Sequence, residues 1–135
     1  MSPLHYFIIM IYVTLDIFFL IFHSGLIIFN LFGWIWKPTR KANLITLLLT
    51  GLSWVGLGLF FGIGYCPLTD WHWNILYELG KPPQTPSYVA YLFSRILNVD
   101  MYSHSADLLT TYSYLLALVL SAIVNIRARI RRIKP

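Results

Sequence analysis

Three long hydrophobic runs divide the chain, and a polar, aromatic stretch separates the second run from the third. The runs cover about residues 6–36, 43–65 and 107–126. Each is near or above the roughly 20 residues that a helix needs to cross a bilayer. Since backbone polar groups find no partner in lipid, such runs are predicted to be helical. The pattern therefore predicts an all-α integral membrane protein, a bundle of three transmembrane helices that forms a single domain over residues 1–135.

Three polar side chains interrupt the first run at intervals of seven residues: Asp16, His23 and Asn30. This spacing places them on nearly one face of a helix. An ionisable group at membrane depth costs roughly 2.5–3.5 kcal/mol on insertion scales, and it usually faces protein, water or a ligand. The stripe is therefore predicted to make polar contacts to other helices. Alternatively, it forms one wall of a cofactor-binding cavity, to which Trp54 of the second run contributes.

Glycine residues concentrate in the second run, where Gly58 and Gly62 form a pair four residues apart. Small residues at this spacing let two helix backbones approach closely in lipid. The pair predicts close packing, either within the monomer or against a second copy.

The stretch of residues 66–106 is too aromatic for a passive loop and predicts two short amphipathic helices outside the cytoplasm. Thr69 or Asp70 can cap the first helix, which runs to Gly80. Ser87 can cap the second, which at about eleven residues is too short to span a bilayer. The second helix is expected to lie on the outer membrane surface or to cap the bundle.

Composition and charge support a membrane location. The chain is 58% hydrophobic and only 11% charged, whereas a soluble domain has about a quarter charged residues. The formal charge of +5 comes from two basic clusters, one between the first two runs and one in a tail over residues 127–135. The positive-inside rule places both clusters in the cytoplasm and the N-terminus outside. The tail can also contact anionic lipid, and no feature predicts nucleic-acid binding.

Haem b is one cofactor that a mid-membrane histidine suggests. A bis-His haem needs a second ligand at matching depth, and the second and third runs contain no histidine. An internal haem is therefore not favoured unless a partner supplies a ligand.

A metal site at the outer face is another hypothesis. Cys66, His72, His104 and Asp107 carry the thiolate, imidazole and carboxylate groups that suit zinc or copper. Their spacing matches no known motif, and contacts to lipid headgroups are the alternative. A catalytic role is less favoured, since no base lies at motif spacing from Cys66 and no phosphate loop, dinucleotide fingerprint or HExxH is present.

Three features occur together along the chain: Asp16 and His23 in the first run, a basic Trp-Lys-Pro-x-Arg turn from Trp36, and the motif Cys66-Pro67-Leu68-Thr69 after the glycine-rich run. Over roughly residues 15–125 this combination resembles the domain of unknown function 2784 family of small bacterial membrane proteins. The resemblance implies a multi-pass protein of the bacterial inner membrane and no established activity. Asp70-Trp71-His72 follows the motif here, where family members more often have Pro-Leu-Glu-Asn.

The leading functional hypothesis is a non-enzymatic accessory or structural subunit, either self-associating or part of a larger membrane complex. Three helices make a thin bundle, so polar groups on the first and small residues on the second are better satisfied against partners. The alternative is a haem-, quinone- or metal-binding membrane protein. It would use His23 and Asp16, or an outer site at Cys66, His72 and His104.

Overall fold

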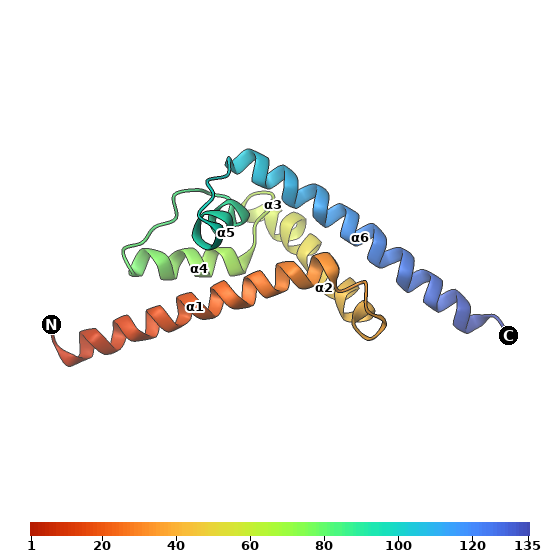
Figure 1. Cartoon of the computed structure of the whole chain (residues 1–135), viewed down its shortest axis with the longest axis horizontal. Coiled ribbons are helices and arrows are strands. Elements are labelled where there is room, and N and C mark those ends of the chain that lie inside the picture. Colours follow the sequence, from red (N-terminus) through yellow and green to blue (C-terminus); the bar gives the residue numbers. More distant parts are fainter. The chain divides into compact units, whose positions relative to one another are not determined.

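The computed structural model describes all 135 residues, and they form helices but no strand. Figure 1 shows the elements, which are α1 (Pro3–Phe32), the 3₁₀-helix η1 (Lys37–Thr39), α2 (Arg40–Leu52), the π-helical turn η2 (Ser53–Leu57), α3 (Gly58–Phe61), α4 (Pro67–Glu78), α5 (Tyr88–Leu97) and α6 (Ser103–Ile133). Three helical stretches are long and apolar enough to cross a membrane: α1, Lys37–Phe61 and α6. The predicted all-α class is thus confirmed, with two short helices between the second and third long stretches.

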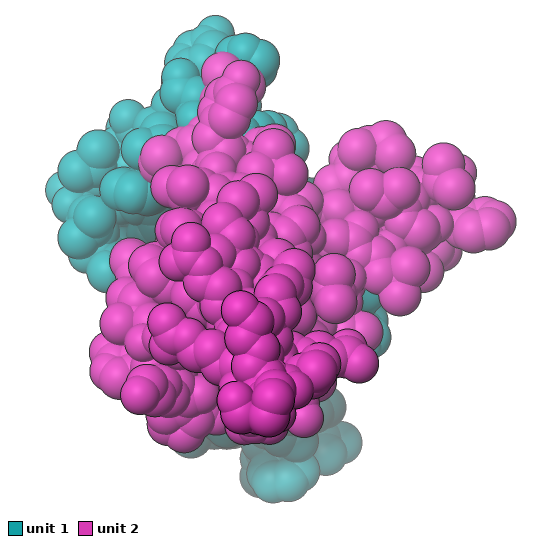
Figure 2. Space-filling model, turned by 90° about the vertical axis from the view of Figure 1, so that its right-hand side faces the viewer, with its two compact units in different colours: residues 1–25, 66–107 teal, residues 26–65, 108–135 magenta.

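The chain folds into two compact units (Figure 2). Unit 1 comprises residues 1–25 and 66–107, and therefore holds most of α1 together with α4 and α5. Unit 2 comprises residues 26–65 and 108–135, and holds the end of α1, the second long stretch and most of α6.

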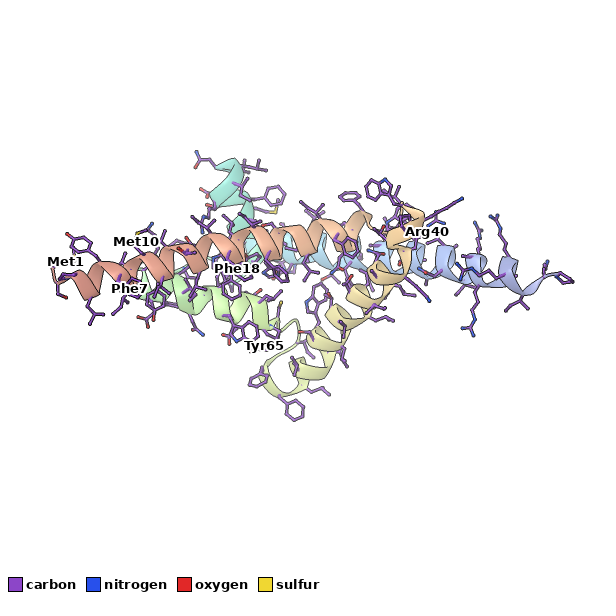
Figure 3. All side chains as sticks on the ribbon, turned by 90° about the horizontal axis from the view of Figure 1, so that it is seen from below. Met1, Phe7, Met10, Phe18, Arg40 and Tyr65 are labelled. Atoms are coloured by element: carbon purple, nitrogen blue, oxygen red, sulfur yellow. The ribbon has the colours of Figure 1, made fainter.

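Large apolar side chains project outward along the long helices. Phe7, Met10 and Phe18 of α1 are exposed and appear as sticks in Figure 3. Many further residues of the second stretch and of α6 are exposed in the same way. An apolar surface of this extent marks contact with a membrane or a protein partner rather than with water, which agrees with the lipid environment that the sequence predicts.

The helix α1 ends at Phe32, four residues before the predicted end, because the following turn captures its last carbonyl groups. The last four carbonyl groups of a helix have no partner among its own residues, and here Gly33 N, just after the helix, donates to the first of them, Phe29 O, at 2.8 Å. Asn43 and Trp34 supply side-chain donors, and Ile35 supplies a backbone donor. The bonds run from Asn43 Nδ2 to Phe29 O (2.7 Å) and Asn30 O (3.2 Å), from Trp34 Nε1 to Leu31 O (2.8 Å), and from Ile35 N to Phe32 O (3.1 Å).

The second long stretch ends at Phe61, also four residues earlier than predicted. Gly62 and Gly64 have φ values of +110° and +91°, which glycine adopts without strain. They turn the chain back, so that Gly64 N donates to Trp54 O at 3.0 Å.

The close packing predicted for Gly58 and Gly62 takes a different form. Gly62 follows the helix, so the two glycines do not share a helix face. A Cβ at Gly58 would lie 3.0 Å from the backbone Cα of Ile63. Gly58 therefore makes room for the returning chain within the monomer, and it does so without Gly62 on the same helix face.

The helix α4 begins at Pro67, not at Thr69 or Asp70 as predicted. Pro67 occupies the first helical position, where the missing N–H costs nothing, and Cys66 before it is extended. The predicted end is confirmed. Gly80 has a φ of +68°, Gly80 N donates to Tyr77 O, and Lys81 N donates to Leu76 O, the bonds of a Schellman motif.

The helix α5 starts and stops as predicted. The hydroxyl of Ser87 accepts from Ala90 N at 3.4 Å, which makes Ser87 the N-cap. At the other end Asn98 adopts a left-handed conformation with a φ of 54°.

The helix α6 continues to Ile133, whereas the sequence predicted a membrane span ending near residue 126 and a basic tail over residues 127–135. Arginine is a good helix former, and cations near a helix C-terminus interact favourably with its dipole. Most of the predicted tail is therefore helical, and its basic side chains project from the last turns of α6.

Candidate functional site

Asp16, near the middle of α1, is only 5% exposed and lies at the centre of a buried polar cluster in unit 1. Arg95 of α5 binds both carboxylate oxygens, through Nη1 to Oδ1 at 2.6 Å and Nη2 to Oδ2 at 2.9 Å. His72 Nε2 of α4 is 2.8 Å from Oδ1. Bidentate arginine–carboxylate pairs are among the strongest polar contacts in proteins. Asp16 thus joins α1 to both short helices, and α4 runs beside α1 in Figure 1.

His72 connects Asp16 to Tyr88. It is fully buried, and its second ring nitrogen, Nδ1, lies 2.8 Å from the Tyr88 hydroxyl. Burial lowers the pKa of His72, and the positive charge of Arg95 acts in the same direction against the opposing effect of Asp16. A neutral ring fits both contacts, since Nε2–H then donates to Asp16 and Nδ1 accepts from the hydroxyl.

Tyr88 and Arg95 keep the charge states that this network requires. Burial raises the pKa of Tyr88, so its hydroxyl remains a donor. The hydrogen bond to Asp16 raises the pKa of Arg95, which therefore stays charged. Arg95 also donates to the Tyr91 hydroxyl and lies 5.9 Å from the centre of that ring. Trp73 packs against both tyrosines, with ring centres 5.2 Å from Tyr88 and 4.9 Å from Tyr91.

His23 lies two helical turns from Asp16 and contacts other neighbours. It is 6% exposed, and its ring stacks on Tyr88 with the centres 4.0 Å apart. Its Nε2 atom is 3.9 Å from Cys66 Sγ, while Nδ1 is buried without a hydrogen-bond partner. The predicted shared face of Asp16 and His23 is thus buried within the protein, and each side chain bonds separately.

Asn30 and Trp54, the other residues of the predicted cofactor group, belong to unit 2. Asn30 is 8% exposed and donates to Thr50 Oγ1 at 3.0 Å. The Trp54 ring packs on Tyr114 with the centres 4.7 Å apart. Both side chains therefore have partners other than the Asp16 cluster.

The predicted convergence of Cys66, His72, His104 and Asp107 on a metal is wrong. Nowhere in the chain do three or more His, Cys, Asp or Glu side chains form a group that could hold a metal ion. His72 is committed to Asp16, and Cys66 faces His23. His104 is exposed at the start of α6.

Sequence reasoning missed the partners of Asp16. It predicts no role for Arg95 and makes His72 a candidate metal ligand. One signal was present, because Arg95 and Lys81 are the only basic residues outside the two basic clusters. An isolated arginine on an apolar helix, in a chain with a buried aspartate elsewhere, indicates a complementary pair.

The chemistry available to the cluster follows from these contacts. Both oxygens of Asp16 accept hydrogen bonds, and Arg95 neutralises its charge. A carboxylate held in this way is a weak base, and its release would leave an unpaired buried charge. The arrangement is therefore suited to clamping three helices together.

The chain belongs to the family described as "Protein of Unknown function (DUF2784)", whose model matches residues 13–128. The match contains every residue of the cluster and confirms the resemblance seen in the sequence. No curated protein and no solved structure matches the chain.

Proposed function

We propose that this protein is a non-enzymatic accessory or structural subunit, of a larger membrane complex or of an assembly of its own copies. The observation that carries the proposal is the closed bonding of Asp16, whose two oxygens are used by Arg95 and His72. The Asp16 carboxylate thus holds helices together, and its closed bonding argues against a catalytic or proton-carrying role.

The fixed position of α4 and α5 supports a role in recognition. Trp71 and Tyr77 are exposed on α4, and Ile96 and Leu97 are exposed on α5. Aromatic and large apolar side chains on a rigid element are typical of protein interfaces. The bonds of Asp16 to Arg95 and His72 therefore keep this surface ordered, so that a neighbouring subunit can recognise it at low entropic cost.

We place the protein in the inner membrane of a bacterium, with the N-terminus and the segment containing α4 and α5 outside and the C-terminus in the cytoplasm. The distribution of basic residues supports this orientation, because eight of the ten lie within residues 37–41, between the first two long helical stretches, or within residues 127–134, at the end of the chain.

Native gels of mildly solubilised membranes test the accessory role. The tagged full-length chain should migrate in a band well above that of a single 15.7 kDa chain in its micelle. Arg95→Gln should reduce this band while the protein stays in the membrane, and Arg129→Gln, outside the cluster, should not. A wild-type chain that remains monomeric in gels and in cross-linking of intact membranes would remove the proposal.

A second candidate function is the binding of a small apolar molecule, such as a quinone, at His23. It is favoured by the buried Nδ1 atom of His23, which has no protein partner, since such atoms are rare and costly. Absorption spectra and mass spectra of organic extracts should then reveal a molecule that wild-type protein retains and His23→Leu loses. Colourless protein whose extracts contain only bulk lipids would exclude this function.

A further inference from the structure

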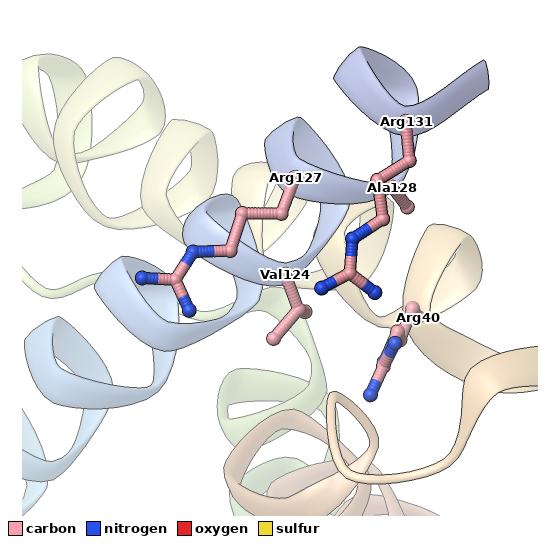
Figure 4. A pocket seen from close by; sticks show the side chains of 5 residues that line it. All are labelled: Arg40, Val124, Arg127, Ala128 and Arg131. Carbon is pink, nitrogen blue, oxygen red and sulfur yellow. The ribbon is translucent and has the colours of Figure 1, made fainter. Parts of the chain in front are cut away.

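Three arginine side chains surround a hollow of about 190 Å³ in unit 2 (Figure 4). Arg40 is the first residue of α2, and Arg127 and Arg131 lie one turn apart on the same face of α6. Val124 and Ala128 complete the lining. Asn125 Nδ2 donates to Arg40 O at 3.0 Å, which fixes the start of α2 against α6 at this level.

No acidic side chain of unit 2 balances these charges. All five acidic residues of the chain lie in unit 1, where Asp16 pairs with Arg95. Like charges gathered around one hollow repel each other. The N-terminus of α2 adds the positive end of its helix dipole. The hollow is therefore positively charged, and no acidic side chain of unit 2 compensates this charge.

The orientation of Arg40 favours an anion that accepts several hydrogen bonds at once. Its Nε donates to Trp34 O at 3.0 Å, so the guanidinium is held in place before any ligand arrives. Guanidinium groups match the oxygens of phosphate with paired hydrogen bonds. A phosphate group is the anion that best satisfies several such donors together.

The surroundings indicate that this phosphate belongs to a lipid. Ile126 and Ile130 are exposed on α6 beside the arginines, and Trp34 and Trp36 mark a membrane interface in the adjacent turn. Basic pockets between membrane helices bind the headgroups of anionic lipids. We propose that the hollow between Arg40, Arg127 and Arg131 binds the headgroup phosphate of an anionic phospholipid, whose acyl chains lie along α6. This inference is independent of the accessory role.

The test uses full-length protein in vesicles of phosphatidylcholine with or without phosphatidylglycerol. Lipid retained after mild extraction is counted by native mass spectrometry, and the unfolding temperature is measured in both vesicles. The pocket variant is Arg127→Gln/Arg131→Gln. Its matched control is Arg129→Gln/Arg132→Gln, which removes the same charge from the same helix but lines no part of the hollow.

Wild type and the control should retain phosphatidylglycerol preferentially and gain stability from it. The pocket variant, which lacks two arginines, should bind it roughly thirtyfold more weakly. If the pocket variant and the control lose phosphatidylglycerol affinity equally, the effect comes from diffuse charge and the proposal is overturned. Equal retention of the two lipids by wild type would also overturn it. Inorganic phosphate or glycerol phosphate that displaces the lipid at equal concentration would assign the site to a soluble phosphate instead. If the double variant fails to fold, the single variant Arg127→Gln against Arg129→Gln makes the same comparison.

Discussion

At the scale of single residues, Asp16 and Arg95 decide whether the first helix tolerates an acidic group. A carboxylate in the middle of a membrane helix costs roughly 2.5–3.5 kcal/mol on insertion scales. Arg95 offsets this by binding both oxygens, from a position 79 residues away in the sequence. Breaking such a pair from one side is worse than removing both partners, since one charge is left without compensation.

This asymmetry predicts the outcome of a double-mutant cycle on the pair. Arg95→Gln should lower the free energy of unfolding in detergent by about 1–3 kcal/mol, because Asp16 remains buried and loses its counter-charge. Asp16→Asn combined with Arg95→Gln should cost less than the two single changes together. Chemical or thermal unfolding followed by circular dichroism provides the measurement. Additive effects would show that the two side chains do not interact energetically.

The pH dependence of stability should report on His72. Burial holds its pKa below the ordinary value of 6.5 in the folded state. The unfolded chain therefore binds the proton first, and stability is lost as pH falls from about 6.5 toward the folded pKa, by up to about 1.4 kcal/mol per pH unit.

His72→Gln is the matched control for this dependence, because its amide can still donate to Asp16 and accept from Tyr88 without titrating. Unfolding temperatures measured from about pH 8 to about pH 5 should fall more steeply for wild type than for the variant. Parallel curves would mean that His72 is not the titrating group.

At the scale of helices, the end of α1 depends on Asn43. This residue is fully buried in α2, and its Nδ2 atom donates to two terminal carbonyl groups of α1. Backbone carbonyls without a partner cost several kcal/mol in lipid. A single amide thus joins the ends of two membrane helices.

Two substitutions at Asn43 test whether the end of α1 needs a hydrogen-bond donor at this position or only a polar side chain. Asn43→Ala should destabilise the protein by about 1–3 kcal/mol, since two carbonyls each lose a donor. Asn43→Asp should destabilise it more, because a carboxylate oxygen would then face the same carbonyls. Asn74→Ala, at an exposed position of α4, is the control and should change little. Thermal unfolding in one detergent ranks the variants, and an Asn43→Asp variant as stable as wild type would refute the capping role.

The elements illustrate what sequence patterns can and cannot predict. The long helices and the capped ends of α4 and α5 followed from local rules, that is, hydrophobic run length, Ser87 and Gly80. The end of α1 did not, because Asn43 of the next helix binds its last carbonyl groups. The end of the second stretch did not either, because only the structure shows which of its glycines adopt a positive φ. The seven-residue spacing likewise predicted that Asp16 would be shielded, but not that a residue of α5 would shield it.

At the scale of the whole molecule, charge divides sharply between the two units. Unit 2 holds eight of the ten basic residues and no acidic one, while unit 1 holds all five acidic residues. The basic residues of unit 2 are Lys37, Arg40, Lys41, Arg127, Arg129, Arg131, Arg132 and Lys134. The helix α6, at 31 residues, is longer than the roughly 20 that cross a bilayer. Its basic end can therefore extend beyond the hydrocarbon.

This division predicts the orientation of the chain in a bacterial membrane. A fluorescent protein that folds only in the cytoplasm should be bright when fused after Pro135, since the basic end of α6 resists translocation. An alkaline phosphatase that is active only outside should be active when inserted after Pro82, in the exposed turn between α4 and α5. A Ser2→Cys variant without Cys66 should react with an impermeant thiol reagent in whole cells. A dark fusion after Pro135, an inactive phosphatase after Pro82 and an unlabelled Ser2→Cys variant would together reverse the orientation and move the arginine hollow to the outer leaflet.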